Sequence, residues 1–132
     1  MNAVVVDASA LVELLLQRGR TRAVRAALER ARTLHAPHLV DVEVLHALRG
    51  LQLRGFLDHD RAALAVAAFS DLPIERYAHA PFTPRIWALR HAVTSYDAAY
   101  LALAEVLDAP LLTCDARLER SHGHGARVIV AR

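Results

Sequence analysis

The sequence predicts an α/β domain in which helices cover both faces of a mostly parallel central sheet. Three observations support this class. Short apolar runs alternate along the whole chain with longer stretches of helical periodicity. The first run, Ala3–Val6, leads directly into a helical stretch ending at Leu16, as expected of a buried strand followed by its helix. The stretch Ala98–Leu107 is apolar almost all the way round and therefore predicts an internal helix.

The remaining elements follow from periodicity and from capping residues. Further helices are expected over residues 23–31, 39–48, 61–69, 84–89 and 95–107, and further strands over 33–36, 74–77, 110–113 and 127–130. Gly50 is expected to end the third helix, and Asp58 or Asp60 to cap the fourth. Thr83 is expected to cap the fifth helix, with Pro84 in its first turn, and the next begins near Thr94.

Length and composition indicate one domain over residues 1–132, because a chain of this size rarely holds two cores. Hydrophobic residues make up 55% and charged residues 23%, which excludes wholesale disorder. The longest apolar runs, such as residues 62–69, fall short of the roughly 18 residues of a membrane span. Since no basic leader precedes the first strand and Cys114 is the single cysteine, we expect a cytoplasmic protein without an intrachain disulfide.

All sixteen basic residues are arginine. The lack of lysine excludes a P-loop and Schiff-base chemistry, because both need an amine. Six arginines fall within fifteen residues that contain one acid, Glu29: Arg18, Arg20, Arg22, Arg25, Arg30 and Arg32. Such a cluster could follow an RNA backbone through phosphate contacts, and a solvated helix face is the alternative explanation.

Four acidic residues from four separate segments are expected at one edge of the sheet. Asp7 and Asp115 directly follow predicted strands, Asp97 lies in the first turn of the apolar helix, and Glu43 lies in the helix after the second strand. Ligands of such sheets bind beyond the carboxyl ends of the strands, where these side chains could converge. Each acid also has a structural explanation: helix capping for the aspartates and solvent exposure for Glu43.

The apolar surroundings of Glu43 and Asp97 favour the joint interpretation, because burying an unpartnered carboxylate costs several kcal/mol. Two carboxylates about 5 Å apart repel by roughly 3 kcal/mol at an effective dielectric of 20. A divalent cation would relieve this repulsion, and oxygen donors favour Mg²⁺ or Mn²⁺. Such an ion lowers the pKa of a bound water, as phosphodiester hydrolysis requires. Ser9 and Thr113 are expected to hydrogen-bond the carboxylates or the metal waters.

Four motifs carry a family resemblance across nearly the whole chain: VVDASAL at 5–11, APHLVDVEVL at 36–45, SYDAAYLALA at 95–104 and TCDARL at 113–118. Together they resemble the PIN-domain ribonucleases, and among these the VapC-type toxins of bacterial toxin–antitoxin pairs. The resemblance implies a PIN-like three-layer sandwich and Mg²⁺- or Mn²⁺-dependent endonucleolytic cleavage of RNA. It implies a homodimer silenced by a cognate antitoxin, with four catalytic metal-binding acids: Asp7, Glu43, Asp97 and Asp115.

One position departs from the pattern. Some family members carry a further acid where this chain has Arg117, so we expect one strongly bound ion before RNA arrives. Arg117 could instead contact substrate phosphate, or lie in a solvated turn. Two alternative functions stay open: another metal-dependent phosphohydrolase or 5′ nuclease, and a catalytically silent module that binds RNA or a partner.

Five other side chains have candidate roles. Cys114 is expected to be a buried strand-end residue rather than a nucleophile. His122 and His124 form a loop that could ligate metal or contact RNA, or simply form a surface turn. Tyr100, like Trp87, is expected to serve packing or an interface.

Overall fold

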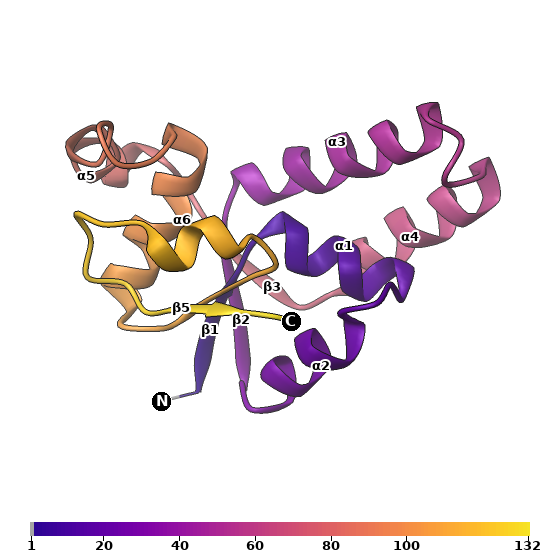
Figure 1. Ribbon diagram of the computed structural model, residues 1–132, viewed down its shortest axis with the longest axis horizontal. Coiled ribbons are helices and arrows are strands. Elements are labelled where there is room, and N and C mark those ends of the chain that lie inside the picture. Colours follow the sequence, from indigo (N-terminus) through magenta and orange to yellow (C-terminus); the bar gives the residue numbers. More distant parts are fainter. Residues whose placement is uncertain (1) are drawn as a thin grey trace.

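A computed structural model describes residues 2–132 and places a wholly parallel five-stranded sheet at the centre of the molecule (Figure 1). The strand order is β3-β2-β1-β4-β5. The strands are β1 Ala3–Val6, β2 Thr33–Pro37, β3 Ile74–Tyr77, β4 Leu111–Thr113 and β5 Val128–Val130. The expected α/β class is confirmed, and the sheet is parallel throughout rather than mostly parallel.

Helices flank the sheet on both sides, with α1, α3 and α4 on one side and α5 and α6 on the other (Figure 1). The helices are α1 Ala8–Leu16, α2 Thr21–Glu29, α3 Leu39–Leu53, α4 His59–Asp71, α5 Thr83–Ala88 and α6 Ser95–Leu107, with 3-10 turns at Ala80–Phe82 and Ala116–Arg120. Seven consecutive residues of α6, 98–104, are buried, which confirms the internal helix. Among residues 2–132, no helix is long and apolar enough to cross a membrane.

Two expected helix boundaries are wrong. Gly50 does not end α3, which continues to Leu53 because the residues after Gly50 are good helix formers and Gly50 still accepts a bond from the Arg54 amide. Gly55, with a φ of +81°, forms the turn that follows. Thr83 is not the N-cap of α5, because the preceding 3-10 turn runs into the helix and the Thr83 hydroxyl donates back to Ala80 O.

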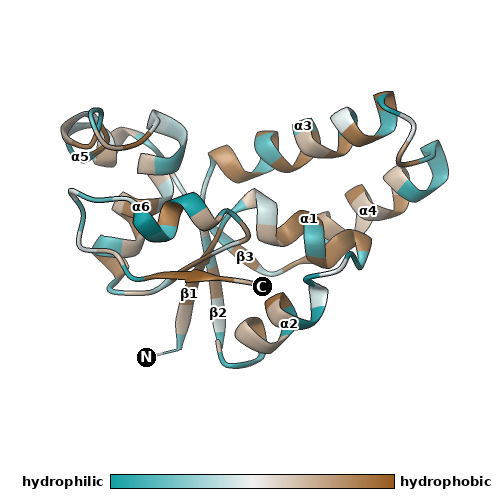
Figure 2. Cartoon of the chain, in the orientation of Figure 1, coloured by the Kyte–Doolittle hydropathy of each residue, from teal (hydrophilic) through white to brown (hydrophobic). Residues whose placement is uncertain are grey.

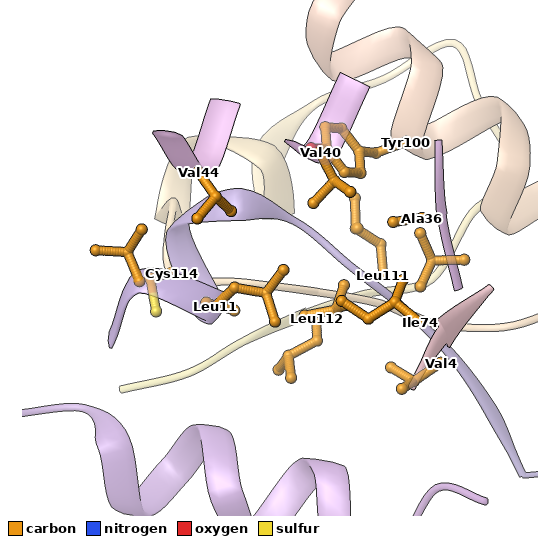
Figure 3. Close-up of a cluster of buried hydrophobic side chains, with 14 of the residues drawn as sticks. Val4, Leu11, Ala36, Val40, Val44, Ile74, Tyr100, Leu111, Leu112 and Cys114 are labelled. Carbon is orange, nitrogen blue, oxygen red and sulfur yellow. The ribbon is translucent and has the colours of Figure 1, made fainter. Parts of the chain in front are cut away.

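The hydrophobic core lies between the sheet and the long helices. Leu11 of α1 and Leu111 and Leu112 of β4 are fully buried, and Figure 3 shows them packed together with Val40 and Tyr100. The core fixes the carboxyl ends of β1 and β4 side by side, because Val6 pairs with Leu112. The residues that directly follow β1 and β4 are therefore held in defined positions at the carboxyl ends of the two strands.

Candidate functional site

The ends of β1 and β4 bring Asp7 and Asp115 to the same edge of the sheet. The Asp7 amide donates to Leu112 O at 3.1 Å, continuing the ladder between the two strands. Each aspartate also begins a helical segment: the Asp7 side chain accepts from the Ala10 amide, and the Asp115 side chain from the Arg117 amide. Asp7 and Asp115 therefore lie at the ends of strands and also cap the helical segments that follow.

Asp7 is a buried carboxylate held by neutral donors. Ser9 Oγ donates to its Oδ1 at 2.7 Å, and Thr113 Oγ1 donates to its Oδ2. Only 8% of the residue is exposed, and burial raises the pKa of Asp7 to about 6, with a smaller contribution from the charge of Glu43. Within residues 2–132, no arginine or histidine nitrogen lies within 4.0 Å of this carboxylate.

The two hydroxyls also tie the two strand ends together. Thr113 Oγ1 accepts from the Asp115 amide at 3.0 Å, and Ser9 Oγ accepts from the Cys114 amide at 2.9 Å. Each hydroxyl thus donates to Asp7 while accepting from the backbone of the segment after β4. This network fixes the Asp7 carboxylate relative to Asp115, because any rotation of Asp7 would break its bonds to Ser9 of α1 and to Thr113 of β4.

Glu43 points toward the same region from α3, and its orientation is set by a tyrosine. Tyr100 Oη donates to Glu43 Oε1 at 2.6 Å, and burial, followed by this bond to Glu43, raises the pKa of Tyr100. The sequence predicts packing or an interface for Tyr100, and the residue is indeed buried, but its bond to Glu43 was not predicted. Its position three residues after Asp97 on α6 was a usable signal, since that spacing places both side chains on one helix face.

The sequence predicts that apolar neighbours surround Glu43, and this prediction is wrong. Val42 is 67% exposed and Leu45 is 47% exposed, whereas Val40 and Val44 are buried. Hydrophobic and hydrophilic residues thus alternate along α3 (Figure 2), and Glu43 itself is half-buried. The helix is apolar on two faces, and the acid lies between them.

Asp97 and Asp115 are a second pair of neighbouring acids, and their pKa values shift in opposite directions. Burial raises the pKa of Asp97, and the charge of Asp115 adds to this. Arg117 instead lowers the pKa of Asp115 through a two-pronged ion pair, with Nε to Oδ1 at 3.1 Å and Nη2 to Oδ2 at 2.7 Å. The arginine found in place of a further acid therefore serves as a counter-ion to Asp115.

Two cavities are lined by three of the four acids, and Asp7 lines neither of them. One of about 520 Å³ is lined by Asp97, Asp115 and Arg117, and another of about 430 Å³ by Ser9, Glu43 and Asp115. Asp115 lines both. As the side chains stand, no group of three or more His, Cys, Asp or Glu residues within 2–132 converges to hold a metal ion.

The donor chemistry nevertheless fits a hard divalent cation. The four groups are carboxylates, and Asp7 has no arginine or histidine nitrogen within 4.0 Å among residues 2–132. Burial, with a smaller contribution from the charge of a neighbouring acid, raises the pKa of Asp7 and of Asp97. For an ion to bind Asp7, Asp97 and Asp115 together, the Asp115 carboxylate would have to release the Arg117 guanidinium and bind the ion in its place.

The arginine cluster found in the sequence divides in space. Arg18 and Arg20 line the cavity with Glu43 and Asp115, and Arg20 Nη1 donates to Cys114 O at 2.9 Å. Their partner is the buried Glu13 of α1, 3.4 Å from Arg20 Nη2, an acid that sequence reasoning missed. In contrast, Arg22 and Arg25 on α2 line neither cavity of the acids.

The remaining candidates have local roles. Cys114 is buried and burial raises the pKa of its thiol, as expected of a structural cysteine (Figure 3). His124 hydrogen-bonds within its own loop, to Ser121 Oγ and the Ala126 amide, whereas His122 lines the cavity of Asp97. Trp87 is 67% exposed on α5, beneath the guanidinium of Arg90.

The fold and the acids define a parallel α/β domain with carboxylates at its strand ends. The chain belongs to the PIN domain family, whose model matches residues 4–122.

Similar proteins agree with this assignment. Ribonuclease VapC12 of Mycobacterium tuberculosis (strain ATCC 25618 / H37Rv) is 45% identical over 125 residues, covering 95% of this chain and 96% of the relative. The fold resembles that in a crystal structure of VapBC2 from Rickettsia felis bound to a DNA fragment from their promoter, at a TM-score of 0.72 and 13% identity, covering 98% of this chain and 99% of that one. It also resembles a toxin-antitoxin complex from Klebsiella pneumoniae at 0.63 and 17% identity, covering 98% of each chain.

Proposed function

We propose that this chain is a divalent-metal-dependent endoribonuclease and the toxin of a toxin–antitoxin pair. The observation that carries the proposal is Asp7, a buried carboxylate with no arginine or histidine nitrogen within 4.0 Å among residues 2–132, set by Thr113 beside Asp115 at the edge of a parallel sheet. A buried acid of this kind needs a positive partner, and its neighbours supply further negative charge. The likeness to a relative named as a ribonuclease supports the same conclusion.

The metal-binding residues we propose are Asp7, Asp97 and Asp115, with Glu43 completing the set or orienting the attacking water. Mg²⁺ is the expected ion and Mn²⁺ its substitute, and when bound it supplies positive charge for the phosphate and lowers the pKa of water. One strongly held ion is expected before RNA arrives, because Arg117 stands where a further acid would favour a second.

The protein groups would act by position and by proton transfer. Ser9 and Thr113 hold the two oxygens of Asp7, so that its carboxylate is preorganised. Tyr100 fixes one oxygen of Glu43 and leaves the other to accept a proton from water. Arg20, in the same cavity as Glu43, and Arg117 are placed to attract a phosphate of the RNA backbone.

The proposed partners follow from the same assignment. They are an RNA substrate, a cognate antitoxin and a second copy of the chain in a homodimer, acting in the cytoplasm. The solved VapBC2 and toxin–antitoxin structures with this fold support the antitoxin.

Cleavage of total RNA with and without Mg²⁺, mapped at nucleotide resolution, tests the function. Internal cuts that need the ion and disappear in Asp97→Asn support the proposal. Loss of nucleotides only from RNA ends would favour an exonuclease or 5′ nuclease instead. RNA binding without any turnover would indicate a silent module.

A further inference from the structure

A third cavity lies where the ends of α1 and α3 meet the start of α4. It measures about 360 Å³ and is lined by three arginines, Arg18, Arg54 and Arg61, and by apolar residues that include Phe56. Among residues 2–132, no acidic residue lines it. Figure 1 shows the end of α3 and the start of α4 meeting at one extremity of the molecule.

Few carboxylates neutralise the arginines of this pocket. Neither Arg54 nor Arg61 has a carboxylate within 4.0 Å in residues 2–132, and Arg18 reaches Glu13 only at 3.9 Å. Asp58 is nearby in sequence, but its side chain accepts from the Arg61 backbone amide rather than from the guanidinium. The pocket therefore concentrates positive charge that the protein itself leaves available.

The turn that follows α3 exposes the Phe56 side chain to solvent. Gly55 adopts a φ of +81°, and the Phe56 amide donates back to Leu51 O at 2.9 Å, which closes the end of α3. The ring is 70% exposed, with the Arg54 guanidinium 5.7 Å from its centroid. An exposed aromatic ring beside guanidinium groups is the arrangement on which nucleobases stack while phosphates are neutralised.

The pocket is continuous with the proposed catalytic cavity. Arg18, Leu51 and Arg54 line both this pocket and the cavity that contains Glu43 and Asp115. We propose that Arg18, Arg54, Arg61 and Phe56 form a binding subsite for single-stranded RNA, in which Phe56 stacks on a base several nucleotides from the cleaved bond. The inference rests on the proposed RNA substrate and adds where its flanking strand lies.

Binding of a fluorescently labelled ten-nucleotide single-stranded RNA, followed by anisotropy in EDTA, tests the subsite. Phe56→Ala should weaken binding roughly 5- to 100-fold, because one base loses its stacking partner. Phe56→Trp should retain the affinity and Phe56→Leu should lose it, since a stacking surface needs an aromatic ring. Matched controls are Leu64→Ala, which removes a 71% exposed side chain of α4, and the wild type.

The salt dependence tests the arginines separately. Replacing Arg54 and Arg61 together by alanine should reduce the slope of log affinity against log salt by about 1.4, since each phosphate contact on a single strand contributes about 0.7. Arg127→Ala, which removes an exposed arginine directly before β5, is the control, and its slope should equal that of the wild type. Circular dichroism of each variant checks that the fold is retained.

The outcomes separate this inference from the proposed function. Unchanged RNA affinity and salt slope in all pocket variants overturn the subsite, even if the wild type cleaves RNA. The subsite is equally overturned if an acidic peptide, and not RNA, loses affinity in these variants. RNA binding that depends on Phe56, in a wild type that never cleaves RNA, supports the subsite and refutes the endoribonuclease.

Discussion

Asp7 and Asp115 follow neighbouring parallel strands, yet the protein treats their charges in opposite ways. Asp7 is buried among hydroxyl groups, and burial raises its pKa to about 6. Asp115 is more exposed and is paired by Arg117, which lowers its pKa. The comparison teaches that, within residues 2–132, one carboxylate of a site can have no arginine or histidine partner while its neighbour is paired with an arginine. A metal ion would relieve the first and would have to displace a guanidinium from the second.

The largest expected effect is on the first carboxylate. Asp7→Asn should reduce RNA cleavage by more than about 100-fold, because it removes a charged oxygen donor from the proposed ion site. Cleavage of a defined RNA in saturating Mg²⁺ measures this. Asp60→Asn, an exposed acid in the first turn of α4, is the control and should keep full activity. An Asp7→Asn variant as active as this control would contradict the proposed role of Asp7 in binding the ion.

The same carboxylate should make the metal-free protein sensitive to pH. Because the folded-state pKa of Asp7 is raised, its contribution to stability is present at low pH and is lost as pH rises through about 6. In EDTA, Asp7→Asn should therefore gain stability relative to the wild type between about pH 4.5 and 7, by up to roughly 3 kcal/mol.

Urea unfolding of both proteins across this pH range measures the difference. Excess Mg²⁺ at pH 7 should narrow it, because the ion stabilises only the folded wild type. Unfolding free energies that run parallel in the two proteins at all pH values would contradict the role assigned to burial.

The hydroxyl network should show a smaller effect. Thr113→Val removes the donor to Asp7 Oδ2 and the acceptor for the Asp115 amide while keeping the shape of the side chain. We expect cleavage to fall about 10- to 100-fold, as for other groups that orient a metal ligand. Thr83→Val, whose hydroxyl bonds only Ala80 O, is the matched control for the assay. Equal rates in the two variants would show that the network is not needed.

The smallest effect is expected at the second carboxylate. Arg117→Gln should raise Mn²⁺ affinity by a few-fold, because the ion no longer competes with a guanidinium for Asp115. Titration followed by the electron paramagnetic resonance of free Mn²⁺ measures this without RNA. Arg30→Gln, at the opposite end of the sheet, should bind as the wild type does. A weaker Mn²⁺ affinity in Arg117→Gln would refute the competition.

The strands and most helices could be predicted from sequence because their signals are local. Asp58, one of the two caps expected for α4, is its N-cap, and α6 begins directly after Thr94 as expected, since a cap depends only on residues within one turn. The end of α3 was predicted too early, because Gly50 weakens a helix without stopping it when the following residues still favour the helix. The three aspartates could be proposed because each follows a strand or lies in the first turn of a helix, whereas Glu43 lies inside α3 and was proposed from its apolar neighbours.

The sequence alone determined the parallel α/β fold and the segments that carry Asp7, Glu43, Asp97 and Asp115. Only the tertiary structure decided that Arg117 neutralises Asp115, that Tyr100 holds Glu43, and that Arg54 and Arg61 join Arg18 around Phe56. The reason is physical: periodicity and capping report on neighbours a few residues away. Charge pairing and pocket formation depend instead on side chains that only packing brings together.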